Sequence, residues 1–162
     1  MTGKRDELGR ALELAYRALG TRDRTEHELR VSLTHKDVPS DVIEDAVAEL
    51  IAAGLLDDVR YARCFTEDRR LLDQWGTERI AGDLARRGIR SDVIVAALSD
   101  VSQADELDSA LEILARRCAE PLRTDQDRDR AWRLLVRRGY EPELAYTAVR
   151  RYERSFQRRA AA

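Results

Sequence analysis

The chain has 162 residues, of which 43% are hydrophobic and 37% are charged, and its formal net charge is −2. This composition is typical of a folded protein with a heavily charged surface, and the nearly balanced charge argues against a protein that is basic over its whole surface. No apolar run approaches the roughly eighteen residues of a membrane helix, and the first residues do not resemble a signal peptide. We therefore expect a cytoplasmic protein, and the absence of strand-like alternation favours an all-α fold.

The first third of the chain, residues 1–56, has the pattern of three helices. Apolar residues recur at helical spacing over the first twenty residues. Thr25 and Glu28 then have the spacing of a capping box, which predicts the start of a second helix. Ser40 follows a proline that the second helix cannot include, and it is expected to cap a third helix ending at Gly54.

The same three-helix pattern is expected in residues 57–101 and again in residues 102–162, where the last helix is rich in arginine. Side chains that favour helix N-termini mark where these helices should begin. The expected starting positions are Asp57 or Asp58, Thr77, Ser91, Ser102 and Pro142.

The three segments align with one another at a constant shift of 51 residues without gaps. The strictest matches lie in the turn between the second and third helices, at Asp37, Gly88 and Gly139, followed by Val38, Ile89 and Tyr140. Glycine, and less readily aspartate, can take the left-handed conformation that closes a helix, and the apolar residue then fills the gap before the next helix. The repeat predicts three tandem three-helix repeats in an elongated, curved array, which offers a long surface rather than a pocket.

The most distinctive motif lies between the first two repeats. It reads Leu50-Ile-Ala-Ala-Gly-Leu-Leu-Asp-Asp-Val-Arg-Tyr-Ala-Arg-Cys-Phe65, followed by Trp75-Gly76, Arg79-Ile80, Leu84 and Arg87-Gly88-Ile89. This pattern resembles the RecX family of regulators of the RecA recombinase, and the similarity extends through the helical repeat over the whole chain. The departures are Asp37, where a glycine is usual, and Ala131-Trp132, where the second repeat has Ile80-Ala81.

The resemblance implies a regulator and not an enzyme. RecX-like proteins bind RecA–DNA filaments, along the groove or at the end, and restrain ATP hydrolysis, filament growth and strand exchange in homologous recombination, DNA repair and the SOS response. The implied partners are the RecA filament and the single- or double-stranded DNA inside it, with no membrane, and we expect a monomer. The family implies no catalytic residue, cofactor or metal, and the sequence leaves groove coating and end capping open.

Charge is distributed unevenly along the chain, since residues 37–58 hold seven acids and no base, whereas residues 128–162 hold ten arginines and four acids. Paired arginines occupy equivalent positions in the second and third repeats, with Lys36 as a partial match in the first. Such a stripe suits an acidic RecA surface or DNA phosphates, although helix C-termini favour solvated cations for structural reasons alone. The predicted partner-binding residues are Arg69, Arg70, Arg79, Arg86, Arg87, Arg137, Arg138, Arg150 and Arg151.

A DNA-binding protein and a helical enzyme are the two alternatives to a regulator of RecA. A stand-alone helix-turn-helix-like DNA-binding protein is the main alternative. Stretches with acidic but no basic residues, such as residues 37–58, count against it. A helical enzyme finds little support, because His27 and His35 lack a convincing partner and are expected on the surface of the second helix. Cys64 and Cys118 lack metal-ligand spacing, and we expect both to be reduced.

Overall fold

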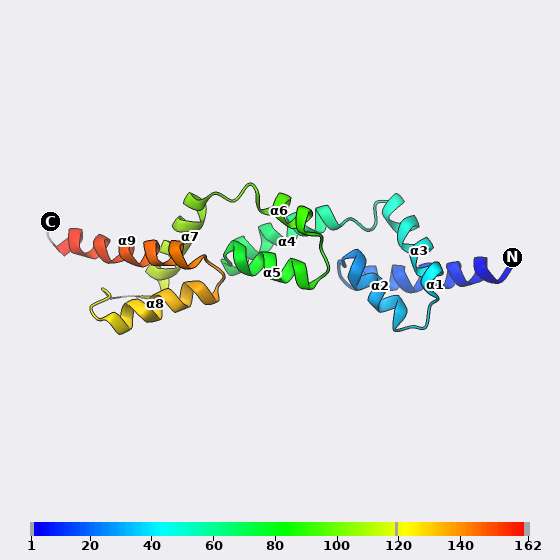
Figure 1. The fold of residues 1–162 in the computed structure, drawn as a ribbon, viewed down its shortest axis with the longest axis horizontal. Helices are drawn as coiled ribbons and strands as arrows, with labels where there is room; N and C mark the ends of the chain where they lie inside the picture. Colours follow the sequence, from blue (N-terminus) through cyan, green and yellow to red (C-terminus); the bar gives the residue numbers. More distant parts are fainter. Residues whose placement is uncertain (1, 119, 161–162) are drawn as a thin grey trace. The chain divides into compact units, whose positions relative to one another are not determined.

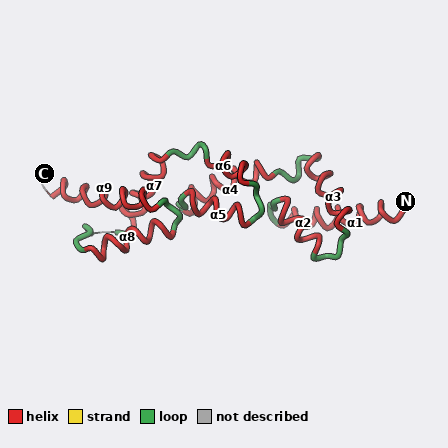
Figure 2. The backbone as a smooth tube through the Cα atoms, viewed as in Figure 1, coloured by secondary structure: helices red, strands yellow, loops and turns green. Residues whose placement is uncertain are grey.

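The computed structural model describes residues 2–118 and 120–160, and the chain is helical throughout this part, without a strand. Loops and turns connect the helices (Figures 1 and 2). The helices are α1 (Thr2–Thr21), α2 (Glu26–Thr34), α3 (Ser40–Ala52), α4 (Asp58–Asp73), α5 (Thr77–Arg86), α6 (Ser91–Leu98), α7 (Gln103–Arg117), α8 (Asp125–Arg137) and α9 (Pro142–Ala160). This confirms the all-α class. Within the described residues, none of these helices has the length and apolar character needed to cross a membrane.

The contacts between residues group the chain into two compact units. The first unit contains the residues up to Cys64 together with Leu84–Ile94, and the second contains Phe65–Asp83 and the residues from Val95 onward. Helices α4, α5 and α6 are therefore divided between the units. The repeat boundaries after residues 56 and 101 are boundaries of sequence similarity, and they stay a prediction.

The first unit is built on packing among α1, α2 and α3. Its core contains Ala15, Leu29, Leu33, Ile43, Val47, Leu50 and Leu56. The capping box predicted for α2 is confirmed, since the Glu28 amide donates to Thr25 Oγ1 at 3.1 Å and the Thr25 amide donates to the Glu28 carboxylate at 3.4 Å. The expected cap at Ser40 is wrong: α3 already includes Ser40, and Pro39 before it occupies the cap position without a side-chain hydrogen bond.

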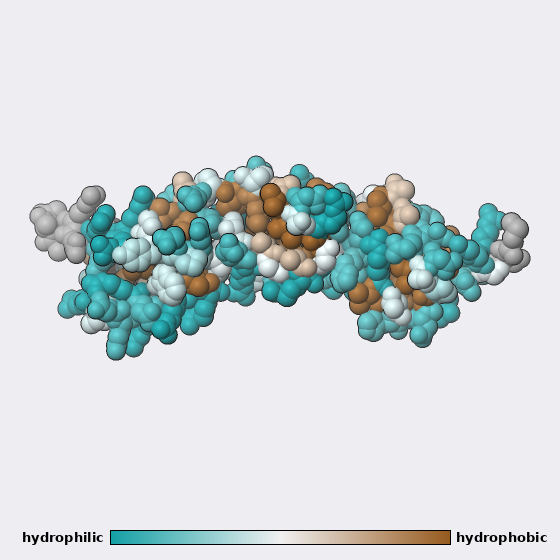
Figure 3. Space-filling model, in the orientation of Figure 1, coloured by the Kyte–Doolittle hydropathy of each residue, from teal (hydrophilic) through white to brown (hydrophobic). Residues whose placement is uncertain are grey.

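The second unit has its core among α7, α8 and α9. A capping box joins Ser102 to Asp105 at the start of α7, where Ser102 was expected to mark a helix start. A further box that the sequence analysis missed joins Thr124 to Asp127 at the start of α8. Tyr140 fills the core as the turn pattern predicted. It is 1% exposed, its hydroxyl donates to the Gln74 carbonyl at 3.1 Å, and burial raises its pKa to about 12. Figure 3 shows hydrophilic side chains over most of the visible face of α7–α9, in keeping with the charged composition.

Within the first unit, the turn between α5 and α6 rests on the first turn of α2. Thr25 Oγ1 donates to the Arg87 carbonyl at 2.6 Å. Gly88 has a φ of +80°, and a Cβ built on it would lie 2.3 Å from the Cβ of His27. This position therefore requires glycine for two reasons: the residue has the left-handed conformation, and its backbone contacts a neighbouring helix. We call this the first turn–helix contact.

Within the second unit, the turn between α8 and α9 repeats this arrangement 51 residues later, on the first turn of α5. The Gly76 amide donates to the Arg138 carbonyl at 2.8 Å, and Gly76 and Arg138 are the repeat equivalents of Thr25 and Arg87. A Cβ built on Gly139, whose φ is +88°, would lie 2.2 Å from the Cβ of Arg79. This second turn–helix contact shows that the 51-residue repeat is a repeat of contacts as well as of helices. In the first repeat, Asp37 also has a positive φ, of 56°, but its side chain is exposed.

Carboxylates from a later helix close the N-termini of α2 and α5. The Glu26 amide, at the start of α2, donates to Asp58 Oδ1 at 2.9 Å, and the Thr77 amide, at the start of α5, donates to Glu106 Oε1 at 2.8 Å. Asp57 caps its own helix by accepting from the Arg60 amide. The expected helix starts at Asp57 and Thr77 are confirmed, but Thr77 does not cap α5: it is the first residue of this helix, and its amide and hydroxyl both donate to a carboxylate of α7. Partial burial raises the pKa of Asp58.

Comparison of Gly88→Ala with Gly54→Ala should separate the cost of the left-handed conformation from the cost of the overlap with His27. Gly54 also has a positive φ, of +69°, but nothing lies within 4 Å of the point where its Cβ would be. Gly54→Ala should therefore lower the free energy of unfolding by about 1 kcal/mol, through the strain of a left-handed alanine alone. Gly88→Ala adds the overlap with His27, and we expect the free energy of unfolding to fall by about 2–4 kcal/mol. Urea denaturation measures both. Equal losses in the two variants would show that conformation alone explains Gly88.

Candidate functional site

The structure gives the two members of each arginine pair different surroundings. Arg87 Nη1 donates to Glu28 Oε1 at 2.8 Å, and Arg138 Nη1 donates to the Asp73 carbonyl at 2.8 Å. The carbonyls of the same two residues accept the hydrogen bonds of the turn–helix contacts. Arg86 and Arg137, which come first in each pair, are exposed. The second arginine of each pair therefore holds the fold, and the first faces the solvent.

Arg69 and Arg79 meet at one aromatic ring of the second unit. The guanidinium carbon of Arg79 lies 3.8 Å from the ring centroid of Trp75, and that of Arg69 lies 5.5 Å from it and 5.4 Å from Phe65. Arg69 also forms an ion pair with Asp73. Each cation–π contact contributes about 0.5–1 kcal/mol at such sites. These two arginines are thus brought together as the sequence proximity suggested, around Trp75.

The remaining predicted arginines do not join one site. Arg70 Nη1 lies 3.9 Å from Glu106 Oε1, in an ion pair whose side chains are only 19% and 8% exposed, so Arg70 supports the carboxylate that closes α5. Arg150 stands 5.9 Å from the ring centroid of Tyr146 on α9, and Arg151 is exposed beside it. The role of the nine arginines in partner binding stays a prediction. The following members of this set contact a carboxylate, a carbonyl or an aromatic ring of the protein: Arg69, Arg70, Arg79, Arg87, Arg138 and Arg150.

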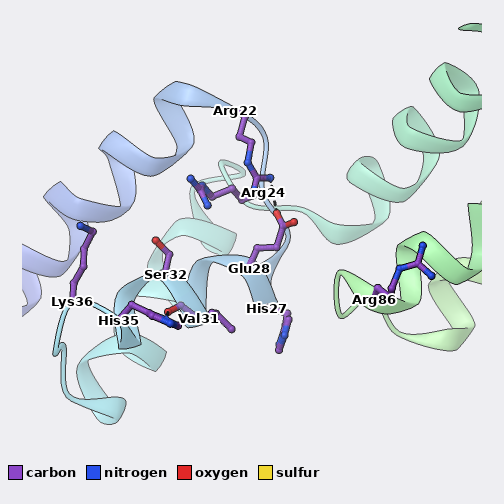
Figure 4. Close-up of a pocket in the computed structure, with 9 residues that line it drawn as sticks. All are labelled: Arg22, Arg24, His27, Glu28, Val31, Ser32, His35, Lys36 and Arg86. Carbon is purple, nitrogen blue, oxygen red and sulfur yellow. Dashed lines mark hydrogen bonds and ion pairs between the residues drawn. The ribbon is translucent and has the colours of Figure 1, made fainter.

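A basic groove of about 570 Å³ runs along the exposed side of α2 in the first unit (Figure 4). Helix α2 supplies four of the nine lining residues, and the turn after it supplies His35 and Lys36. The loop before α2 supplies two arginines, and the end of α5 supplies one more. Figure 4 shows Lys36 and Arg86 toward opposite ends of this lining. The lining residues are Arg22, Arg24, His27, Glu28, Val31, Ser32, His35, Lys36 and Arg86.

The single carboxylate in this lining is already paired. Glu28 accepts from Arg22 Nη1 at 2.8 Å and from Arg87 Nη1 at 2.8 Å. Burial raises the pKa of the Glu28 carboxyl, but the hydrogen bond from Arg22 and the charges of Arg22 and Arg87 outweigh it, so the pKa lies below its ordinary value. The charge of Glu28 is therefore balanced inside the protein. Lys36, Arg24 and Arg86 are the other cationic side chains of the lining.

The sequence analysis named Arg86, and Lys36 as the partial match of the arginine pairs in the first repeat, but not the other residues of this groove. His27 is exposed on α2, as expected, and His35 is exposed directly after the C-terminus of this helix. In the repeat register, His35 and Lys36 precede Arg86 and Arg87 by 51 residues. The positions that follow the second helix of the first repeat thus carry polar and basic groups as well, and they lie on the same groove as Arg86.

Comparison with known proteins agrees with this architecture. Sequence profiles of the first and second three-helix domains of RecX match residues 11–50 and 57–98. The regulatory protein RecX of Thermobifida fusca is 30% identical over 149 residues, which cover 90% of this chain and 80% of that protein. That of Mycobacterium avium is 33% identical over 148 residues, with 90% and 84% covered. The crystal structure of RecX from Lactobacillus salivarius has the same fold, with a TM-score of 0.81 at 18% identity over 91% of this chain and 97% of that one.

The contacts and the matches together identify the fold of this protein and its family. Its fold is that of a tandem three-helix repeat protein, in which the turn of one repeat contacts the second helix of the repeat before it. The two matched domains together span more than half of the chain, and relatives at 30% identity or more match over most of their length. The chain belongs to the RecX family, and its role is regulatory.

Glutamine at Arg87 should destabilise the protein, whereas glutamine at its neighbour Arg86 should not. Arg87→Gln removes a charged partner from the partly buried Glu28 carboxylate, which typically costs about 1–2 kcal/mol. Arg86 is exposed, and substitutions at such positions usually change stability by less than about 0.5 kcal/mol. Thermal and urea unfolding of both variants measure the difference. A loss at Arg86 equal to that at Arg87 would contradict the separation of roles.

The pH dependence of a Glu28→Gln variant should report on the same carboxylate. Because the pKa of Glu28 is lowered in the folded state, its ionisation adds stability that is fully present above its ordinary pKa of 4.5 and disappears as the pH falls through the folded-state pKa. Glu28→Gln should therefore be less stable than wild type at pH 7, and the gap should shrink below about pH 4.5. Glu13→Gln, an exposed change on α1, is the control and should show no such gap.

Proposed function

We propose that this protein binds the RecA–DNA filament and restrains ATP hydrolysis, filament growth and strand exchange. The observation that carries the proposal is membership of the RecX family over most of the chain, with relatives that are regulatory proteins. Homologous recombination, DNA repair and the SOS response are the processes in which this regulation would act. Its place would be the cytoplasm, where RecA assembles on DNA.

The charged surface supports a contact with an acidic partner. Arg86, Arg137 and Arg151 are exposed, and Arg86 and Arg137 recur at the repeat spacing. Their guanidinium groups suit carboxylates on a protein surface and phosphates within a nucleoprotein filament equally well. We assign the partner contacts to these exposed arginines, because Arg70, Arg87 and Arg138 are used inside the fold.

Titration of the protein into RecA that hydrolyses ATP on single-stranded DNA tests the proposed function. Hydrolysis should fall as the protein is added, because bound protein blocks subunit exchange or the turnover of filament subunits. Half-inhibition far below one molecule per RecA would indicate capping of the filament end, and half-inhibition near equal amounts would indicate coating of the groove. Undiminished hydrolysis at an excess of the protein would contradict the proposed function.

Charge reversal at Arg86 and Arg137 tests the assigned contacts. We expect the R86E/R137E variant to need at least about tenfold more protein for half-inhibition, which corresponds to about 1.4 kcal/mol of lost binding, while its helicity is unchanged because both side chains are exposed. The matched control is R10E/R17E, which makes the same change in net charge at exposed positions of α1. Equal weakening by both variants would show that net charge alone is responsible.

A further inference from the structure

We propose that a pocket between α8 and α9, within the second unit, binds a protein segment in which a bulky apolar side chain lies next to a carboxylate. The pocket has a volume of about 390 Å³, and the lining residues that would contact such a segment are Trp132, Tyr146, Val149 and Arg150. The proposal goes beyond the regulation of RecA, because it assigns the protein a contact made by aromatic rings and does not depend on the arginine pairs.

Aromatic side chains from both helices form the walls of this pocket. Trp132 belongs to α8 and Tyr146 to α9, two helices that pack side by side (Figure 1). Val149 is 3% exposed and belongs to the core of the unit, whereas Tyr146 is 57% exposed. An aromatic side chain buries roughly 150–250 Å² when it is fully covered. An apolar side chain of a partner would therefore remove much of the exposed Tyr146 ring from water.

Two hydrogen-bonded links between α8 and α9 order the pocket before anything binds. Trp132 Nε1 donates to the Pro142 carbonyl, at the start of α9, at 3.1 Å, and this bond orients the indole ring. Arg128 Nη2, on α8, donates to Glu153 Oε1, on α9, at 2.7 Å. Because binding loses less conformational entropy when the side chains of a site are already ordered, these links favour recognition of a partner.

The two carboxylates of the lining already bind arginines of the same helix. Asp125 Oδ1 accepts from Arg128 Nη1 at 2.6 Å, and Asp129 Oδ2 lies 3.0 Å from Arg133 Nη2. Their negative charges are therefore balanced by α8 itself, and they do not call for a cationic ligand.

Arg150 is the charged side chain of the lining that is left for a partner. Within the described residues, no carboxylate forms an ion pair with it, and its guanidinium carbon lies 5.9 Å from the centroid of the Tyr146 ring. A contact with an aromatic ring uses the positive charge of a guanidinium and not its N–H donors. A carboxylate of a partner can bind these donors while the apolar side chain next to it enters the pocket.

The lining favours a protein segment over a nucleic acid. Tryptophan, tyrosine and arginine are the residue types enriched among the side chains that contribute most to protein–protein binding, and all three occur here. A nucleic-acid backbone gains affinity from several cations, each of which neutralises a phosphate. Here Arg128 is paired with two acids, and the lining includes two carboxylates, so a phosphate backbone would find little net attraction.

NMR titration of the full-length protein with a capped peptide tests the proposal. The probe is acetyl-Gly-Glu-Phe-Glu-Gly-amide, and the reporter is the indole N–H of Trp132. The chain has two tryptophans, so the indole of Trp75 is an internal reference. We expect the Trp132 resonance to shift with added peptide and that of Trp75 to stay in place. Glycine for phenylalanine should weaken binding at least about tenfold, and lysine for both glutamates at least about threefold.

Substitutions in the pocket should weaken peptide binding without unfolding the protein, because Tyr146 and Arg150 are exposed. Tyr146→Ala removes one wall and should raise the Kd at least about fivefold, and Arg150→Gln should raise it about threefold. The matched controls are Tyr16→Ala, at a tyrosine that is 50% exposed on α1, and Arg154→Gln, at an exposed arginine one turn later on α9. Both controls should stay within about twofold of wild type.

A Trp132 resonance that does not move at millimolar peptide would overturn the proposal, and so would equal losses in the pocket variants and their controls. A shift produced by the lysine peptide or by an oligothymidylate at lower concentrations than by the acidic peptide would also overturn it, since the pocket would then accept a basic segment or a base. If Tyr146→Ala loses helicity, Arg150→Gln decides in its place. Peptide binding by a wild type that does not inhibit RecA would support the pocket and contradict the proposed function alone.

Discussion

The close contact between a turn and the first turn of an earlier helix is the constraint on which this fold depends. It recurs within each compact unit, through the Arg87 carbonyl on Thr25 and through the Arg138 carbonyl on the Gly76 amide. Backbone atoms can approach this closely because Gly88 and Gly139 have no Cβ. The carboxylates of Asp58 and Glu106 then bind the amides that begin the same two helices. The first amide of each of these helices is therefore bound by a residue that is distant in sequence, in addition to the local capping box of α2, and α2 and α5 cannot complete their native N-termini in isolation.

The same contact sorts the arginines of each pair. The side chain of Arg87 binds Glu28 on α2, and that of Arg138 binds the Asp73 carbonyl at the end of α4, whereas Arg86 and Arg137, one position earlier, are exposed. Two arginines that are adjacent and alike in the sequence therefore have different surroundings in the structure. The second arginine of each pair stabilises the fold, and the first is exposed at a regular spacing along the chain.

The parts of the fold that depend on neighbours in sequence could be predicted from the sequence. The helices, the capping boxes at Thr25 and Ser102 and the left-handed turns all follow from spacing within a few residues. The box at Thr124 carries the same signal and was overlooked in a polar stretch. The capping of α2 by Asp58 and of α5 by Glu106 could not be predicted, because each bond joins residues about thirty positions apart and depends on packing. The groove needed both kinds of information, since its α2 wall is local and Arg86 comes from a later helix.

Asp37 shows what the turn residue reveals about a repeat. It has the positive φ of the other two turns, yet its side chain is exposed and is not pressed against a helix as the glycines are. A turn that only has to bend can be built with aspartate, whereas a turn that must also lie against another backbone needs glycine. During the duplication and divergence of such repeats, the identity of this one residue would record which copies are stacked on a predecessor and which are not.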